Sequence, residues 1–371
     1  MIIAILGASG GVGSCASRWL AQSGHALRLG GRRSTALQPL GLELNAEIQT
    51  VDLWQDRQLS AFCRGCTVVV NCAGPSYQVL DRVARAAAAA GAHYVDVSGD
   101  GPAWHLLQQK PAGDPYWIAI FSAGMLPGLA NLVPVWMSAR SGGNLTVYSG
   151  GIEPVSGAAA KDLVLSLNEH CSALQGSDYW YGEAGASWQL GRRSRHSLLT
   201  QQTDSLAHFP GQVTLLPYLS ADAERLALRR HLSSLRWYNV FSGQCLRETL
   251  TGLRGKVDGS AESLASAAAA VEKASLIDLA GFTPYYQMVF DLQQEDVPYK
   301  RAVITTNSSL ALTAATAVSA VNSLLRGDVP AGVHFADRVL SPSITLQDIG
   351  HLHPGTRISH YQCEQCEEGV L

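Results

Sequence analysis

The sequence has no long run of basic residues, only 15% of its residues are charged, and its formal net charge is −3. Proteins whose main partner is a nucleic acid carry a basic patch, so this composition argues against that class. No apolar stretch approaches the roughly 20 residues that span a bilayer, and the first residues lack the basic segment of a signal peptide. We therefore expect a globular cytoplasmic protein with neither a nucleic acid nor a membrane as partner.

The chain is long enough and apolar enough to form more than one domain. The chain has 371 residues, 47% of them hydrophobic, enough for two domains. Apolar runs alternate with helical patterns over residues 1–122, which is typical of α/β proteins with a doubly wound parallel sheet. We expect a Rossmann-type domain at 1–128, a return of the chain to it at about 308–350, and an α+β substrate or dimerisation domain at 129–307. We also expect a homodimer.

The most informative segment joins an apolar run to a helical pattern through glycines. The run Ile2–Leu6 is followed by a turn with G-x-x-G-x-x-G spacing and then by apolar residues at helical intervals. This is the setting of a dinucleotide-binding turn, where the backbone approaches a pyrophosphate and free helix amides meet its charge. The commoner spacing is G-x-G-x-x-G, so a glycine-rich turn without a ligand is the alternative. The predicted contacts are Gly7, Ala8, Ser9, Gly10, Gly11, Val12 and Gly13.

The acidic residue that NAD-binding domains carry about twenty residues past the glycines is missing. The sequence there is Gly30-Gly31-Arg32-Arg33. A guanidinium at this place can pair with the ribose 2′-phosphate through charge-assisted hydrogen bonds. We therefore predict NADP(H) as the cofactor, with Arg32 and Arg33 as phosphate ligands; two solvated surface arginines are the alternative.

Polar or glycine-rich segments follow several later strands of the expected sheet, at residues 71–76, 98–100 and 123–128. The carboxyl ends of parallel strands share one edge of a sheet, where ligands bind. We expect these segments to converge on the cofactor, although ordinary turn chemistry would select similar residues. The further predicted contacts are Asp52, Cys72, Ala73, Gly74, Pro75, Ser98 and Gly99.

Eight cysteines are present, and two pairs have C-x-x-C spacing: Cys63 with Cys66 and Cys363 with Cys366. Such pairs can form a zinc site, with His360 as a further ligand, but these two lie far apart in the sequence. Reduced thiols of a cytosolic protein are the simpler interpretation. We predict no metal.

The second domain shows a less regular pattern. Helices are expected at 158–173, 225–235 and 260–279. Residues 174–205 are rich in glycine, serine and arginine and indicate a long active-site or interface loop. The aromatic residues of this loop are Tyr179, Trp180, Tyr181 and Trp188.

Several of these segments together match one family pattern: Gly7–Gly13, Gly31–Arg33, Asn71–Pro75, Tyr94–Gly99, Gly124–Asn131 and Gly327–Val333. On them the sequence resembles the saccharopine-dehydrogenase-like NADP reductases, which include reductases of C=N and C=C bonds. Saccharopine enzymes must hold several carboxylates, for which Arg192, Arg193 and Arg195 could serve. Within the family, the chain resembles the thiazolinyl imine reductases of enantio-pyochelin siderophore biosynthesis in its length, its aromatic loop and its cysteines. An NADP(H)-sensing regulatory protein is the alternative of another class.

The resemblance implies that a thiazoline, free or tethered to a carrier protein, is reduced to a thiazolidine. The imine carbon takes a hydride and the nitrogen takes a proton, so a proton donor must lie within hydrogen-bond reach. The predicted candidates are Lys161, His170 and Tyr179 from the second domain and Asp100 from the first; Tyr181 is also considered. Lys161 and His170 are expected on one helix. Ordinary surface or packing roles are the alternative for each of them.

Overall fold

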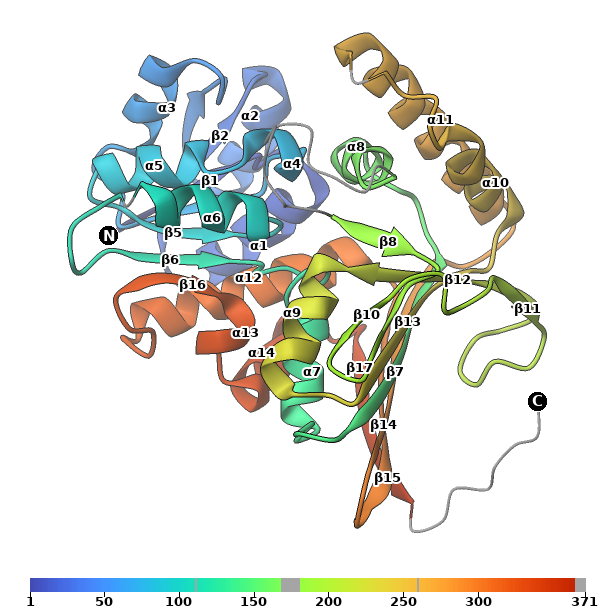
Figure 1. Ribbon diagram of the computed structural model, residues 1–371. Coiled ribbons are helices and arrows are strands. Elements are labelled where there is room, and N and C mark those ends of the chain that lie inside the picture. Colours follow the sequence, from blue (N-terminus) through green and yellow to red (C-terminus); the bar gives the residue numbers. More distant parts are fainter. Residues whose placement is uncertain (111, 168–180, 259, 364–371) are drawn as a thin grey trace. The chain divides into compact units, whose positions relative to one another are not determined.

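The computed structural model describes residues 1–110, 112–167, 181–258 and 260–363, and the chain forms two compact units (Figure 1). Unit 1 consists of Met1–Leu132 and Ser309–Pro354. Unit 2 consists of Val133–Ser308 and Gly355–Leu371. In the described part of the chain, no helix is long and apolar enough to cross a membrane.

A seven-stranded sheet forms the centre of unit 1, in the order β16-β6-β5-β4-β1-β2-β3, and every neighbouring pair is parallel. Its strands are β1 (Ile2–Leu6), β2 (Ala26–Gly31), β3 (Glu47–Thr50), β4 (Val68–Asn71), β5 (His93–Asp96), β6 (Ile118–Phe121) and β16 (Gly332–Phe335). The central strands are continuous apolar runs because both faces of the sheet are covered. The expected doubly wound α/β sheet is thus confirmed.

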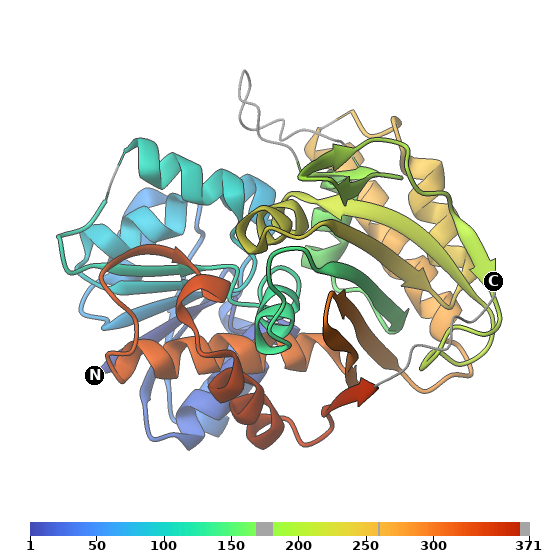
Figure 2. The same ribbon diagram turned by 60° about the horizontal axis from the view of Figure 1, so that its bottom comes forward.

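Helices cover the two faces of this sheet (Figures 1 and 2). They are α1 (Gly11–Gln22), α2 (Ser34–Leu44), α3 (Asp56–Cys63), α4 (Ser76–Val79), α5 (Arg82–Ala89), α6 (Gly101–Gln109), α12 (Ser309–Leu325), α13 (Ala336–Val339) and α14 (Pro342–Leu352). On one face, Ile5 and Val70 pack with Leu20 of α1 and Val318 of α12. On the other face, the core includes Phe62 of α3. Helix α7 (Leu129–Trp136) then leads into unit 2.

The strand order places a topological switch point at β1. From β1 the chain moves through β2 to β3 on one side, and β4 then returns to pair with β1 on the other side. In open parallel sheets, ligands bind outside the carboxyl ends of the strands at such a point. Those ends are Leu6 of β1 and Asn71 of β4.

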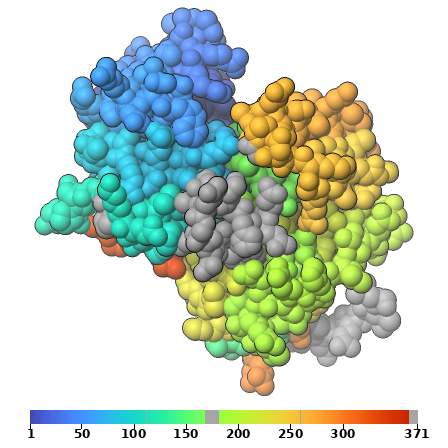
Figure 3. Space-filling view, turned by 45° about the horizontal axis from the view of Figure 1, so that its top comes forward, coloured from blue at the N-terminus to red at the C-terminus, as the bar shows by residue number. Residues whose placement is uncertain are grey.

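A mixed sheet forms unit 2, and its one parallel pair among the described strands is β7 with β13. Its strands are β7 (Asn144–Ile152), β8 (Gly182–Ala184), β9 (Ser187–Gln189), β10 (Arg192–Ser194), β11 (Gln201–Thr203), β12 (Val213–Ser220), β13 (Ser234–Phe241), β14 (Tyr285–Gln294), β15 (Val297–Thr306) and β17 (Arg357–Cys363). The helices are α8 (Gly157–Leu165), α9 (Ala221–Arg230), α10 (Gln244–Leu253) and α11 (Ala261–Leu279). Helix α11 contacts α8, α10 and β7. Leu276 and Ile277 of this helix are exposed. Residues of this part of the chain lie at the surface in the space-filling view (gold in Figure 3).

Three expectations for unit 2 need correction. The helix expected at 225–235 ends at Arg230, because His231 adopts a left-handed conformation (φ 51°) and β13 begins at Ser234. The helix expected at 158–173 ends at Leu165. The expected loop contains the short strands β8 to β11, which pair with one another or with β12 and β13. Tyr179 and Trp180 lie outside the described residues.

Candidate cofactor site

The turn after β1 contains two glycines that the fold itself requires. Gly7 has φ +80°, and a Cβ atom there would lie 2.9 Å from the backbone of Cys72 and Ala73. A Cβ atom on Gly13 would lie 2.3 Å from the carbonyl oxygen of Gly7. The first close approach holds the turn against the segment that follows β4 and the second lies within the turn itself, so the fold explains both glycines without a ligand.

Gly10 and Gly11 are both exposed, but a Cβ atom on Gly11 would lie 2.7 Å from the Leu310 side chain, so packing against α12 also explains that glycine. Gly10 has an ordinary backbone conformation (φ −79°), and a Cβ atom there would meet only the Gly7 carbonyl oxygen, at 3.2 Å. Helix α1 begins at Gly11, and its first backbone bond runs from the Ser14 amide to the Gly10 carbonyl oxygen. The preceding helical amides therefore have no acceptor within the helix. The first turn also contains no acidic residue, so its positive dipole end suits a pyrophosphate.

Arg32 and Arg33 lie at the end of β2, exposed, and neither pairs with any residue that the structure describes. Ser9 of the glycine turn lies beside this strand end, since its Oγ is 3.6 Å from the Cβ position of Gly31. Two other nearby arginines are occupied: Arg18 donates to Glu43 at 2.7 Å and Arg28 to Glu47 at 2.9 Å. The two arginines predicted to hold the 2′-phosphate are thus the ones left accessible to an anion.

Asp52 follows β3, next to β2, because the Val51 amide donates to the Gly31 carbonyl oxygen at 2.9 Å. Its carboxylate accepts from the Trp54 amide at 3.0 Å, and its own amide donates to Gln58 at 2.8 Å. The side chain therefore stabilises the turn that leads into α3. A direct contact between Asp52 and the cofactor stays a prediction.

One buried carboxylate organises the carboxyl ends of β4 and β5. Asp96 is 2% exposed and accepts from the Ser98 amide at 2.9 Å and the Gly99 amide at 2.7 Å. Its other oxygen accepts from the Asn71 side chain at 3.1 Å and from the Tyr94 hydroxyl. The carbonyl oxygen of the Asn71 side chain accepts from the Ala73 amide at 3.1 Å. Asp96 and Asn71 thereby position residues 72–75 and 98–99.

The sequence analysis missed Asp96 and Asn71 as organising residues. Both lie inside segments that match the family pattern. Only the parallel pairing of β4 with β5, in which Asn71 and Asp96 are register partners, explains why an acid and an amide are needed there.

Burial keeps other groups at this edge neutral. Burial and the Asp96 charge raise the pKa of Tyr94 well above its ordinary value, so its hydroxyl stays protonated and donates. The same two causes raise the pKa of the Cys72 thiol. Cys72 therefore adds no negative charge that would oppose a phosphate.

The candidate proton donors are only partly described. Asp100 is the residue before α6 in unit 1, and Lys161 is half-buried in α8 of unit 2. His170 and Tyr179 lie outside the described residues. The prediction that one helix contains both Lys161 and His170 is wrong, because α8 ends at Leu165. Tyr181, which is described, is buried.

Two of the arginines considered for substrate carboxylates already bind a buried acid. Arg195 Nε lies 2.7 Å from Glu183, which is 2% exposed. Arg193 lies 3.6 Å from the same carboxylate and 3.3 Å from Glu224. Burial raises the pKa of Glu224 in spite of Arg193. These arginines therefore compensate buried negative charge within unit 2.

Cys15, Cys63, Cys66, Cys72 and Cys245 are free thiols. Cys63 and Cys66 are buried beneath β2, where Arg28 donates to the Cys66 sulfur at 3.2 Å. Burial raises the pKa of Cys63 to about 12. Over the described ranges, no three His, Cys, Asp or Glu side chains are grouped for a metal ion. Cys366 lies beyond those ranges.

Known proteins share the fold of this chain and the sequence pattern of its first part. Residues 3–119 match the family model described as the saccharopine dehydrogenase NADP binding domain. No curated protein sequence matches the chain. Among solved structures, the L-Glu-forming saccharopine dehydrogenase of Saccharomyces cerevisiae is similar over 98% of this chain and 99% of its own, with a TM-score of 0.67 and 12% identity. Serine dehydrogenase of Escherichia coli is 22% identical over 26% of this chain and 61% of its own, with a TM-score of 0.25. The predicted cofactor, NADP(H), is confirmed, and the protein is an NADP-dependent oxidoreductase with a saccharopine-dehydrogenase-like fold.

Proposed function

We propose that the protein is an NADPH-dependent reductase of a C=N bond, and that a thiazolinyl imine is its substrate, reduced to a thiazolidine in siderophore biosynthesis. The observation that carries the reductase part is the glycine turn with two accessible arginines beside it. The thiazoline follows from the resemblance of the sequence to thiazolinyl imine reductases. In this proposal the enzyme acts in the cytoplasm as a homodimer, on a free or carrier-tethered substrate.

Unit 1 offers candidate contacts for each part of the cofactor. The amides at the start of α1 would hold the pyrophosphate, because the exposed Gly10 has no side chain to block the approach. Arg32 and Arg33 would pair with the 2′-phosphate. Residues 72–75 and 98–99, held by Asn71 and Asp96, would line the same edge of the sheet. When NADPH is bound, the nicotinamide supplies the hydride for the imine carbon.

The imine nitrogen needs a proton, which a side chain of this chain would deliver. We retain Lys161, His170, Tyr179 and Asp100 as the candidates. A half-buried lysine such as Lys161 can donate and then regain a proton from solvent. Assigning the donor requires the pH profile of each single variant.

The ion pairs of Glu183 favour an imine of low charge over saccharopine. A saccharopine enzyme has to hold several carboxylates at once. Arg193 and Arg195 are already paired with Glu183, which is almost completely buried. Releasing them would leave Glu183 unpaired, at a cost of about 3–5 kcal/mol.

The test is reduction of a soluble 2-aryl-thiazoline-4-carboxylate, and of its thioester on a carrier protein, with NADPH deuterated at the transferred position. We expect deuterium at the former imine carbon and stoichiometric NADPH oxidation. Parallel reactions contain an activated C=C substrate, or saccharopine with NADP+. Turnover of one of these instead of the thiazoline would replace our proposal with an enoyl reductase or a saccharopine-type enzyme. Tight NADPH binding with no turnover would favour an NADP(H) sensor.

A further inference from the structure

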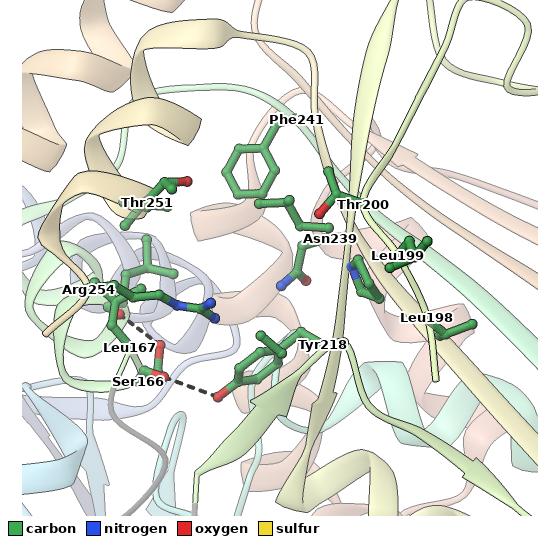
Figure 4. A pocket seen from close by; sticks show the side chains of 16 residues that line it. Ser166, Leu167, Leu198, Leu199, Thr200, Tyr218, Asn239, Phe241, Thr251 and Arg254 are labelled. Carbon is green, nitrogen blue, oxygen red and sulfur yellow. Dashed lines mark hydrogen bonds between the residues drawn. The ribbon is translucent and has the colours of Figure 1, made fainter. Parts of the chain in front are cut away.

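Unit 2 contains a pocket of about 400 Å³ between its sheet and two of its helices (Figure 4). Its floor is formed by the adjacent strands β12 and β13, on which Leu216 and Asn239 are register partners. The end of α8 and the end of α10 form further walls. This volume is typical of a site for a small organic molecule.

The walls are mostly apolar. The large apolar side chains are Leu163, Leu167, Leu198, Leu199, Leu216, Phe241 and Leu250. They come from both helices, from both strands and from the segment after β10, so they line the space from several sides, and the exposed Leu163 shows that the pocket is open to solvent. Such walls favour a ligand with an apolar, preferably planar, body.

Two polar side chains with no partner in the described part of the chain face this space. Arg254 follows α10 directly, where the backbone leaves the helix (φ −55°, ψ 126°). Figure 4 shows its guanidinium directed into the pocket, toward the side chains of Asn239 and Tyr218. No described residue pairs with the side chain of Arg254 or Asn239. The Tyr218 hydroxyl donates to the Ser166 carbonyl oxygen at 3.3 Å, which holds the ring at the pocket wall.

Other arginines of unit 2 differ from Arg254. Arg195 lies 2.7 Å from Glu183, Arg301 lies 2.6 Å from Asp291, and Arg230 donates to the Ala139 carbonyl oxygen at 2.6 Å. Arg254 is exposed and has no partner among the described residues, so its guanidinium lies at the solvent-open side of the pocket. A guanidinium there can bind a carboxylate through two parallel hydrogen bonds that add to the charge attraction.

We propose that this pocket binds a small organic acid with a planar apolar body, its carboxylate on Arg254 and a ring heteroatom or hydroxyl on Asn239. The Asn239 amide can donate and accept, so it suits such a polar ring edge. A single arginine among leucines suits one carboxylate better than a phosphate dianion. When the substrate is bound to a carrier protein as a thioester, its carboxylate has been converted to the thioester and cannot pair with Arg254. The pocket therefore favours the free acid. That this acid is the reductase's substrate rests on the proposed function; its binding does not.

Calorimetry on the full chain without NADPH tests this, with 2-phenyl-4,5-dihydrothiazole-4-carboxylate and its methyl ester as probes. We expect the acid to bind roughly tenfold to hundredfold more tightly than the ester. Arg254→Gln should abolish that difference. Arg247→Gln is the matched control, because Arg247 belongs to α10, which Arg254 follows, but pairs with Glu248 outside the pocket. The nearly isosteric substitution Asn239→Asp should weaken binding of the acid by roughly tenfold or more, because the two carboxylates repel each other.

Equal affinity of acid and ester for the unmodified protein would overturn the proposal, and so would equal acid affinity in Arg254→Gln and Arg247→Gln. The acid–ester comparison needs no variant, so a poorly folded variant does not block the test. If the acid binds through Arg254 but NADPH does not reduce it, the proposed function fails while the pocket assignment stands. If NADPH reduces it with an unchanged KM in Arg254→Gln, the pocket assignment fails while the function stands.

Discussion

The buried carboxylate of Asp96 accepts a hydrogen bond from the side-chain amide of Asn71 at 3.1 Å, and this bond joins the carboxyl ends of two neighbouring parallel strands. The segments that leave these strands are the ones predicted to contact the cofactor. Asp96 and Asn71 therefore hold in place the segments that are predicted to contact the cofactor, and are not predicted to contact it themselves.

Asp96→Asn should lower both stability and cofactor affinity. The new amide nitrogen would face donors, since the Asp96 carboxylate now accepts from two backbone amides and two side chains. We expect a loss of about 1–3 kcal/mol in the free energy of unfolding, measured by urea denaturation. Asp56→Asn is the control, because Asp56 is an exposed partner of Arg82 and should change stability by less than about 1 kcal/mol. Equal losses in the two variants would contradict the role of Asp96.

Arg32→Ala combined with Arg33→Ala should weaken NADPH binding roughly tenfold to hundredfold, because a charge-assisted contact to the 2′-phosphate is lost. NADH lacks that phosphate, so its affinity should hardly change. Fluorescence titration with both cofactors measures the ratio. Arg18→Ala, which breaks only an exposed pair with Glu43, should leave the ratio unchanged. A similar loss for NADH and NADPH would refute the phosphate assignment.

Gly10→Val and Gly13→Ala should separate binding from folding. Valine at exposed Gly10 keeps an allowed backbone but obstructs the pyrophosphate, so NADPH affinity should fall about tenfold or more with little loss of stability. Alanine at Gly13 would place Cβ 2.3 Å from a carbonyl oxygen and should destabilise the fold by about 1–3 kcal/mol. Thermal unfolding and NADPH titration of both variants are the measurements. Unchanged NADPH affinity in a folded Gly10→Val protein would show that the turn does not hold the pyrophosphate.

Arg195→Ala should reduce stability and leave catalysis alone. The substitution removes one partner of the buried Glu183 carboxylate and should cost about 1–3 kcal/mol. Because we place Arg195 in a structural ion pair, KM for the thiazoline should not change. Glu248→Gln, on an exposed carboxylate that pairs with Arg247, serves as the control for stability. A KM increase with unaltered stability would instead place Arg195 at the substrate.

Cys63 should make stability fall at alkaline pH. Burial raises the pKa of its thiol from 9.0 to about 12 in the folded protein. The folded state therefore holds a proton that the unfolded state loses, so the stabilisation is complete below pH 9 and is lost as pH rises toward 12. The slope contributed by this thiol is at most about 1.4 kcal/mol per pH unit. Urea denaturation at several pH values should show a shallower decline for Cys63→Ala, and equal slopes would disprove the effect.

Local patterns were sufficient to predict the parallel sheet and several of the helices. Continuous apolar runs, glycines at strand ends and helical periodicity follow from short-range sterics and from burial on both faces of a parallel sheet. The expected strand Ile2–Leu6 is therefore β1 without change, and the expected helix 260–279 differs from α11 by one residue. The helix expected at 225–235 failed at the left-handed His231, since a helix end of that kind has no glycine to mark it.

The amino-acid sequence by itself determined the class of fold, the glycine turn and the choice of NADP(H), because each depends on residues close together in the chain. Only the tertiary structure decided which charged groups remain available. Arg193 and Arg195 are as basic as Arg32 and Arg33, yet the first two meet a buried glutamate and the second two meet none among the described residues. Arg254 and Asn239 likewise share a pocket only because α10 ends above β13. Whether a charged side chain meets a partner depends on how segments far apart in the sequence pack together, and local residue spacing does not encode that packing.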